Sequence, residues 1–380
     1  MNAPVSKFRT EAEVWRKFEY GRARVSYVNT TDPVEFLDDT VRIRSHESTE
    51  EMRDYLLENV SGTREHPSGC VVAEKGEGDE TVVLNSHMDT VAPHIAYGRE
   101  GNVVRGRGSC DAKGPLSAMV SAYERFDAVD ARTVRLVVSP DEETLSRGLH
   151  DYLNAEGGGF DFAVVGEPTS LDVCTAAKGR FEATVELHGE SAHAAGDGGT
   201  NAVSCASEAV GRLESIEPSY DELLGGSRLT VTRIEGGETP NRVPENATLR
   251  IDRRPVPPET AEGFVSLVEE SLDGIDCGYD VRLADRPTPF LEAFRTDEGN
   301  GHVRRFRSAV EEAVGGTCVR PFGAATEASY LARHAPVVVF GPGGIQEGDG
   351  TPIAHSEREY VGVEEVRGAA EALTRFLNNE

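Results

Sequence analysis

Short apolar runs, each followed within a few residues by an acidic or imidazole side chain, recur along this chain of 380 residues. The runs cover residues 81–84, 134–138 and 162–165. Runs of this length that are rich in Val and Leu are typical of strands buried on both faces of a sheet. His87, Glu143 and Glu167 follow them. The pattern therefore predicts that functional side chains gather at one edge of a sheet.

Amphipathic stretches separate the apolar runs. Apolar residues with the spacing of one helix face are Leu116, Met119, Val120 and Tyr123, and again Leu145, Leu149, Tyr152 and Leu153. Alternating strands and helices favour an α/β fold, in which a mostly parallel sheet is flanked by helices on both faces.

Near residue 177 the pattern changes to a β-α-β-β-α-β order. The strand-like segments are 181–188, 227–234, 246–252 and 279–283, and the helical segments are 201–216 and 260–272. This order predicts an inserted α+β, ferredoxin-like domain. The surrounding domain, which carries the candidate site, is then discontinuous. The expected divisions are 1–30 as an extension, 31–176 and 289–380 as the discontinuous domain, and 177–288 as the insertion.

The formal net charge of −27 is extreme, and only five of the 39 Lys and Arg residues are lysine. This composition is typical of cytosolic proteins of haloarchaea; an ordinary acidic mesophilic protein is the alternative. Self-repulsion at this charge destabilises the compact state, and molar salt shortens the screening length to roughly 3 Å and so relieves it. The charge argues against nucleic acid and anionic membranes as partners.

The sequence has neither an apolar run of about 18 residues, as a membrane span needs, nor the apolar region of a secretory signal at its start. These features predict a cytoplasmic protein. Residues 1–28 are richer in basic than in acidic side chains, unlike the rest of the chain, and predict a disordered extension or a misassigned translation start. The first domain helix is expected near Pro33, with Thr31 and Asp32 as candidate caps.

Six cysteines occur without CxxC spacing. In a chain without an export signal they are expected to be free thiols, mostly buried. Cys110 adjoins Asp111, and we expect it to pack in the interior rather than act as a catalytic thiol.

His87 and Asp89 are two residues apart, so in an extended chain they point to the same side. The Asp89 carboxylate could accept the ring N–H that faces away from a metal. A buried structural histidine is the alternative. Asp111 lies in a glycine-rich loop before a helix, where it could lend one oxygen to each of two cations or simply cap the helix.

Asp141, Glu142 and Glu143 follow a buried strand, where three adjacent carboxylates are unfavourable unless cations neutralise them. Glu143 is predicted to bind metal. Glu142 is predicted to stay unligated, to take a proton from the attacking water and to deliver it to the leaving nitrogen. A solvated acidic turn is the alternative. With Glu167 and His355 the candidate ligands are nitrogen and carboxylate oxygen, which suits catalytic zinc or a neighbouring first-row metal.

These motifs, in this order from about residue 33 onward, resemble the M20 metallopeptidase and deacylase family, which includes acetylornithine deacetylases and succinyl-diaminopimelate desuccinylases. The resemblance implies two divalent cations, most often zinc, with cobalt able to substitute. It implies one cation held by His87, Asp111 and Glu167, and a second held by Asp111, Glu143 and His355. Asp89 would orient His87, and Glu142 would be the general acid and base.

The segment 189–194 resembles the family's lid segment. This likeness implies that the inserted domain is a lid and dimerisation domain, and that His193 reaches across a homodimer to stabilise the oxyanion. Asn241 and Arg254 resemble positions that bind the substrate's carbonyl or carboxylate. Surface roles are the alternative for all three residues.

The segments 325–329, 341–343 and 354–356 most resemble acetylornithine deacetylases, so we expect a small N-acylated amino acid as substrate, in amino-acid biosynthesis. Desuccinylase, carrier-linked lysine or ornithine hydrolase, and dipeptidase or carboxypeptidase activities are the alternatives. A binding module without catalysis is disfavoured because the ligands and Glu142 are all present.

Overall fold

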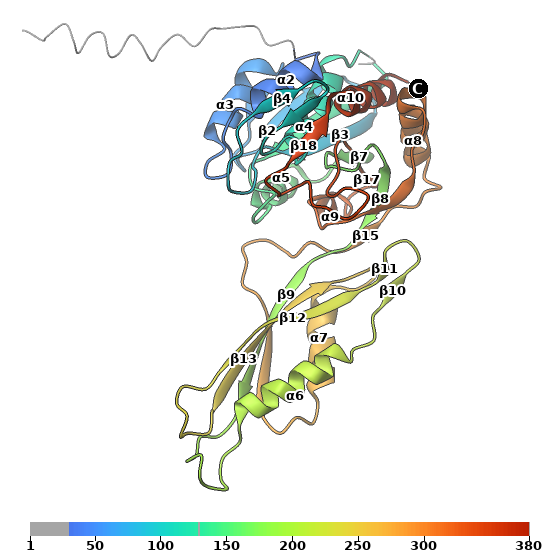
Figure 1. Ribbon diagram of the computed structural model, residues 1–380. Helices are drawn as coiled ribbons and strands as arrows, with labels where there is room; N and C mark the ends of the chain where they lie inside the picture. Colours follow the sequence, from blue (N-terminus) through green and yellow to red (C-terminus); the bar gives the residue numbers. More distant parts are fainter. Residues whose placement is uncertain (1–29, 128–129, 380) are drawn as a thin grey trace, which may run out of the picture.

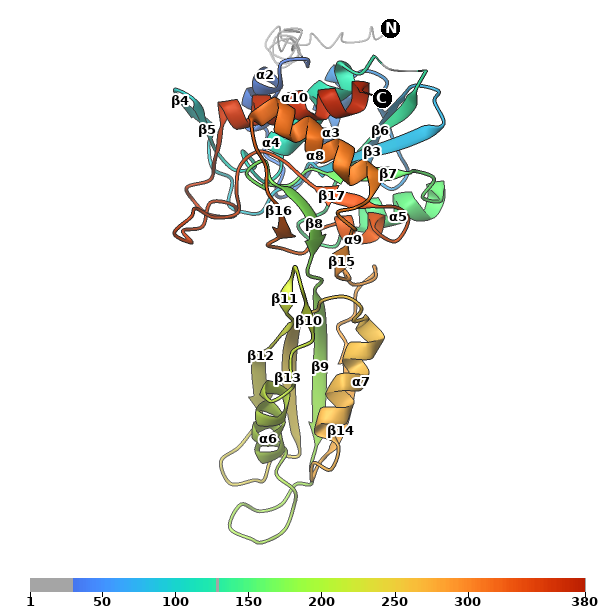
Figure 2. The ribbon, with the colours of Figure 1, turned by 90° about the vertical axis from the view of Figure 1, so that its right-hand side faces the viewer.

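The computed structural model describes residues 30–127 and 130–379. The predicted extension at residues 1–30 therefore lies almost wholly outside the described residues. The chain forms a larger unit around a nine-stranded sheet and a smaller unit around a four-stranded sheet, joined by the segments that lead into β9 and out of β14 (Figures 1 and 2).

The larger unit is built on the nine-stranded sheet. Its strands are β1 (Arg64–Glu65), β2 (Val71–Lys75), β3 (Glu80–His87), β6 (Arg132–Ser139), β7 (Phe162–Val165), β8 (Val173–Ala177), β15 (Phe294–Arg295), β16 (Val319–Phe322) and β17 (Val337–Val339). The strand order is β1-β2-β6-β3-β7-β17-β8-β15, and β16 pairs with β8. The four central strands β6, β3, β7 and β17 run parallel.

The prediction of a mostly parallel sheet is wrong at the flanks, where β2 runs antiparallel to β6, and β8 runs antiparallel to β17 and β15. The links 76–79 and 166–172 explain this. A return to a parallel direction needs a crossover of a dozen or more residues, which neither link has. Each strand that follows a short link therefore reverses its direction, and the sheet is mixed.

Helices cover both faces of this sheet. They are α2 (Pro33–Thr40), α3 (Glu50–Asn59), α4 (Lys113–Glu124), α5 (Arg147–Glu156), α8 (Gly301–Val314), α9 (Ala328–Leu331) and α10 (Val363–Asn378). Successive residues of β7 enter opposite cores: Phe162 and Val164 pack with α4, α8 and α10, while Ala163 and Val165 pack with α5 and α9. This two-sided burial is why the strands read as continuous apolar runs.

Helix α5 begins later than its periodicity predicted. Leu145 lies outside it and is 40% exposed. The carboxylate of Asp141 accepts hydrogen bonds from the backbone N–H groups of Arg147 and Gly148, at 2.9 and 2.8 Å, and so fixes the start of the helix at Arg147. Residues 142–146 are thereby left as a loop above the sheet edge.

The smaller unit is a four-stranded antiparallel sheet in the order β12-β13-β9-β14, with two helices on one face (Figure 1). Its elements are β9 (Phe181–His188), α6 (Ala202–Glu214), β12 (Arg228–Gly236), β13 (Asn246–Arg254), α7 (Ala261–Leu272) and β14 (Gly278–Leu283). This is the strand order of a ferredoxin-like fold. Alternate residues of β9, such as Val185 and Leu187, pack under the helices.

Two small sheets complete the fold. One consists of β4 (Gly98–Glu100), β5 (Val103–Arg105) and β18 (Tyr360–Gly362), and the other of β10 (Tyr220–Asp221) and β11 (Gly225–Gly226). Within the described part of the chain, every helix is too short or too polar to cross a bilayer.

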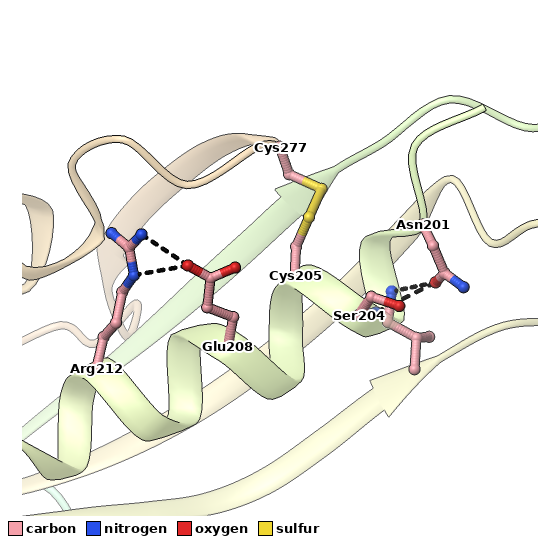
Figure 3. The surroundings of a disulfide bond; sticks show 7 residues. Asn201, Ser204, Cys205, Glu208, Arg212 and Cys277 are labelled. Carbon is pink, nitrogen blue, oxygen red and sulfur yellow. Dashed lines mark hydrogen bonds and ion pairs between the residues drawn. A yellow bond between two sulfur atoms is a disulfide. The ribbon is translucent and has the colours of Figure 1, made fainter. Parts of the chain in front are cut away.

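The expectation of six free thiols is wrong for two of them, because Cys205 and Cys277 form a disulfide (Figure 3). Cys205 lies on α6 and Cys277 directly precedes β14, and packing of the smaller unit brings their Cα atoms to 6.2 Å. They are 72 residues apart, so local spacing gave no signal of the pairing. The free thiols are Cys70, Cys110, Cys174 and Cys318.

We predict that thiol titration of the unfolded, unreduced protein will count four free thiols, and six after reduction. Closing a loop of this length lowers the entropy of the unfolded chain and stabilises the fold by about 4 kcal/mol in the chain-entropy model. Reduction, or the pair Cys205→Ser with Cys277→Ser, should therefore lower the free energy of unfolding by up to that amount in a denaturant titration. Cys318→Ser is the matched control, since Cys318 is an exposed free thiol. Six titratable thiols before reduction would contradict the disulfide.

Candidate metal centre and active site

The five predicted metal ligands meet at one edge of the large sheet. His87 ends β3, and the other four lie in loops: Asp111 before α4, Glu143 after β6, Glu167 after β7 and His355 before β18. They form two groups, His87 with Asp111 and Glu167, and Asp111 with Glu143 and His355. Within each group the candidate ligand atoms lie within 4.8 Å of one another. Asp111 belongs to both groups, as a carboxylate shared by two cations would.

The two oxygens of Asp111 face different imidazoles. His87 Nε2 lies 3.4 Å from Asp111 Oδ1, and His355 Nε2 lies 3.2 Å from Asp111 Oδ2. The Asp111 side chain makes no cap for α4, whose N-cap position is Ala112. The capping alternative for Asp111 is therefore wrong.

The loops that carry these ligands have unusual backbone conformations. Gly106 and Gly108 have φ of 136° and 86°, which is why the turn before Asp111 needs glycine. His355 has φ of 60°, a left-handed conformation that costs of order 1–3 kcal/mol for a residue with a side chain. This conformation brings the His355 ring to 3.1 Å from Glu143 Oε1.

Asp89 connects His87 to the acidic loop after β6. Its Oδ1 lies 3.2 Å from His87 Nδ1, on the ring side away from Asp111. The same carboxylate accepts the backbone N–H groups of Glu142 and Glu143, at 3.1 and 3.0 Å. His87 Nδ1 also lies 3.0 Å from the backbone oxygen of Asp89, so the carboxylate and the main chain of Asp89 both face this ring nitrogen, and its orienting role stays a prediction. Its second task, holding the backbone of the acidic loop, had no signal in the sequence.

The electrostatics of the site suit a cation. Burial, and then the Glu167 carboxylate, raise the pKa of Glu142 well above its ordinary value. Burial and the neighbouring Asp111 raise the pKa of Glu167 to about 8. The pKa of His355 rises to about 10 because Asp111 and Glu143 accept its hydrogen bonds. A cluster with this much buried negative charge gains from divalent cations, which compensate the repulsion between its carboxylates.

His87 Nε2 supports the same conclusion. It is buried and has no hydrogen-bond partner among the described residues. Against burial, Asp111 and Asp89 raise the pKa of His87 well above its ordinary value. A nitrogen aimed at carboxylate oxygens, with its other ring nitrogen held by Asp89, is the arrangement that metal-binding histidines have. The residues therefore fit two divalent cations.

Sequence reasoning missed two further side chains at the site. Thr326 donates a hydrogen bond of 2.9 Å to Glu167 Oε1. Glu327 is buried, accepts a hydrogen bond of 2.6 Å from Ser139, and has its pKa raised to about 8 by burial. The stretch 325–329 had been noted only for its family resemblance, without a role for either residue.

A cavity of about 570 Å³ lies beside the site, between the two units. Glu142, Glu143 and His355 line one side. Arg254, from the end of β13, lines another and pairs with Asp252 through Nε at 2.8 Å. The structure thus brings Arg254 to the same cavity as the candidate metal ligands.

His193 and Asn241 do not line this cavity. The segment 189–200 follows the far end of β9 and lies at the end of the smaller unit remote from the large sheet (Figures 1 and 2). Asn241 accepts a hydrogen bond from Ala194 N–H through its backbone oxygen, so it lies beside that segment.

Cys110 is fully buried, and burial raises its pKa well above the ordinary value, which does not suit a nucleophile.

Residues 83–379 match the model of peptidase family M20/M25/M40. The chain belongs to this family. It is an enzyme, a metal-dependent hydrolase that acts on amide bonds.

Two relatives illustrate the similarity. A protein of Pyrobaculum aerophilum named as a LysW-lysine/LysW-ornithine hydrolase is 30% identical over 351 residues, which is 90% of this chain and 96% of the relative. An acetylornithine deacetylase of Photorhabdus laumondii is 25% identical over 331 residues, which is 81% of this chain and 82% of the relative.

Solved structures share the fold. Aminopeptidase PepT of Bacillus cereus has a TM-score of 0.75 and 20% identity, covering 93% of this chain and 99% of that one. The YXEP protein of Bacillus subtilis, described as a dinuclear metal-binding peptidase of the M20 family, has a TM-score of 0.63 and 15% identity, covering 92% and 97%.

We predict that the chain binds two divalent cations and that each group holds one. His87→Ala should remove one cation and His355→Ala the other, while Asp111→Asn should weaken both, because Asp111 belongs to both groups. Elemental analysis after gel filtration gives the metal content of each variant. His334→Ala, at an exposed histidine that belongs to none of the candidate metal groups of the described residues, is the matched control. A histidine variant that keeps both cations would contradict the assignment.

Proposed function

We propose that this chain is a two-metal amidohydrolase that removes an acyl group from the amino group of a small amino acid. The observation that carries the proposal is the position of Glu142, a carboxylate outside both candidate metal groups that lines the same cavity as Glu143 and His355. That is the place for a group that exchanges protons with the substrate rather than holding a cation.

Two divalent cations, held as above, would polarise the amide carbonyl and make water a stronger nucleophile. Glu142 takes a proton from the attacking water as oxygen adds to the carbonyl carbon. It then passes that proton to the nitrogen as the C–N bond breaks, which leaves a carboxylic acid and a free amine.

Other residues position the reactants. Asp89 holds His87 by its second ring nitrogen and holds the backbone of Glu142, so that ligand and base share one support. Arg254 offers a guanidinium to the carboxylate of the substrate. His193 and Asn241 are remote from the cavity of their own chain, and we assign them to the site of a second copy in a homodimer, where His193 stabilises the oxyanion.

Two candidate substrates follow from the relatives. One is N-acetylornithine, as in an acetylornithine deacetylase. The other is lysine or ornithine linked to a carrier, which the more similar Pyrobaculum aerophilum relative favours. Both reactions release the amino group of a basic amino acid from an amide.

The deciding experiment compares hydrolysis of N-acetylornithine, N-succinyl-diaminopimelate, a carrier-linked lysine and a dipeptide series, in molar KCl with Zn²⁺ or Co²⁺. We predict that Glu142→Gln keeps both cations and lowers kcat by about 10²–10⁴-fold, because only the proton transfer is removed. Glu182→Gln, which lines the same cavity away from the metal groups, should keep most of the activity. A Glu142→Gln variant with undiminished kcat would rule out its role as the base.

The homodimer proposal predicts complementation. Glu142→Ala and His193→Ala should each be inactive alone. After subunit exchange, mixed dimers combine the Glu142 of one chain with the His193 of the other, and about one quarter of the wild-type activity should return. Mixing Glu142→Ala with His355→Ala gives a matched control, because both residues act in their own chain. If the first mixture stays inactive while subunits exchange, His193 does not act across the dimer.

A further inference from the structure

A buried ion pair, Arg107 with Glu359, contacts the backbone of Asp111. Glu359, in the segment before β18, is 1% exposed, and Arg107, in the glycine-rich loop before α4, is also 1% exposed. Arg107 Nη1 lies 2.5 Å from Glu359 Oε2. Arg107 also donates to the backbone oxygens of Pro93 and Ser356, at 3.1 and 3.3 Å.

The other oxygen of Glu359 receives the backbone of the loop itself. Oε1 accepts the N–H groups of Cys110 and Asp111, both at 3.3 Å, and the carbonyl oxygen of Glu359 accepts Gly106 N–H at 3.2 Å. One residue, 248 positions away in the sequence from Asp111, thus holds both ends of the loop.

The chemistry of this contact requires a carboxylate. An ionised carboxylate accepts on both oxygens, so it can take the guanidinium on one and two amides on the other, whereas a glutamine would turn an NH₂ group toward one of them. A well-packed apolar pair would serve stability as well as or better than buried charges do. What a carboxylate at position 359 provides, and an apolar residue would not, is an acceptor for two backbone N–H groups. By accepting them, Glu359 fixes the orientation of the backbone at Asp111.

We propose that Glu359 is a positioning residue for the metal centre. It fixes the backbone of Asp111 so that Oδ1 faces His87 and Oδ2 faces His355. Glu359 does not line the cavity and so does not touch the substrate. Because His355 lies four residues before it, Glu359 also ties the segment of one histidine ligand to the loop of the shared carboxylate. The inference rests on the proposed assignment of Asp111 as the shared ligand.

The test measures affinity for Co²⁺ alone, by competition with a chromophoric chelator, and the visible absorption spectrum of bound Co²⁺. Glu359→Gln should weaken Co²⁺ binding about 10–100-fold, as loss of an outer partner of a ligand typically does. It should also change the spectrum. In turnover assays kcat should fall more than KM changes.

The matched control is Glu259→Gln. Glu259 pairs with Arg253, another guanidinium that is 1% exposed, through two contacts of 2.7 and 2.6 Å in the smaller unit. Both substitutions remove the carboxylate that pairs with a buried arginine, so both should lower the thermal unfolding midpoint. Glu259→Gln should leave the Co²⁺ affinity and spectrum as in the wild type. Equal Co²⁺ affinity in Glu359→Gln and Glu259→Gln would overturn the positioning role.

Glu359→Asp serves if Glu359→Gln does not fold. It keeps the charge but is one methylene shorter, so it cannot hold Arg107 and the two amides together. Weaker Co²⁺ binding supports the proposal, and wild-type binding overturns it. Wild-type protein that binds fewer than two Co²⁺ ions would overturn the metal assignment, and this inference with it, before any variant is compared.

Discussion

The repulsion between buried carboxylates is the constraint on which the rest of this structure depends. Asp89, Asp111, Glu142, Glu143 and Glu167 converge on one sheet edge with two histidines, and burial raises the pKa of Glu142 and Glu167. Such a cluster is unfavourable without positive charge. Two divalent cations would supply that charge, and the hydrolysis of an amide can then use the same ions.

Strands and loops from different parts of the chain supply the side chains of this cluster. The parallel strands β3, β6 and β7 end side by side and deliver His87, the acidic loop and Glu167 to one edge. The remaining ligands come from loops, so their positions depend on contacts from distant parts of the chain. The Asp89 carboxylate accepts a hydrogen bond from the backbone of the acidic loop, and the Glu359 carboxylate accepts one from the backbone of Asp111. The rigidity of the site lies in these contacts rather than in the ligands themselves.

The smaller unit adds the wall of a cavity that the large sheet alone would leave open. Arg254 reaches the cavity from the near end of β13, whereas the segment of His193 lies at the far end of β9. The two ends of one sheet thus face different surroundings. The proposal of a homodimer rests on this arrangement.

The sequence by itself determined the alternation of strands and helices, the β-α-β-β-α-β insertion and which residues are candidates for the site, because each depends on local periodicity or on a short motif. Only the tertiary structure decided which strands lie side by side in the sheet, since a short link limits the direction of a strand but does not choose its neighbours. It also decided the pairing of Cys205 with Cys277, the late start of α5 at Arg147, and the partners Thr326, Glu327 and Glu359. Apart from the start of α5, which Asp141 fixes from six and seven residues away, these features join residues far apart in the chain. They escape sequence reasoning because a contact between distant segments leaves no periodicity in either segment.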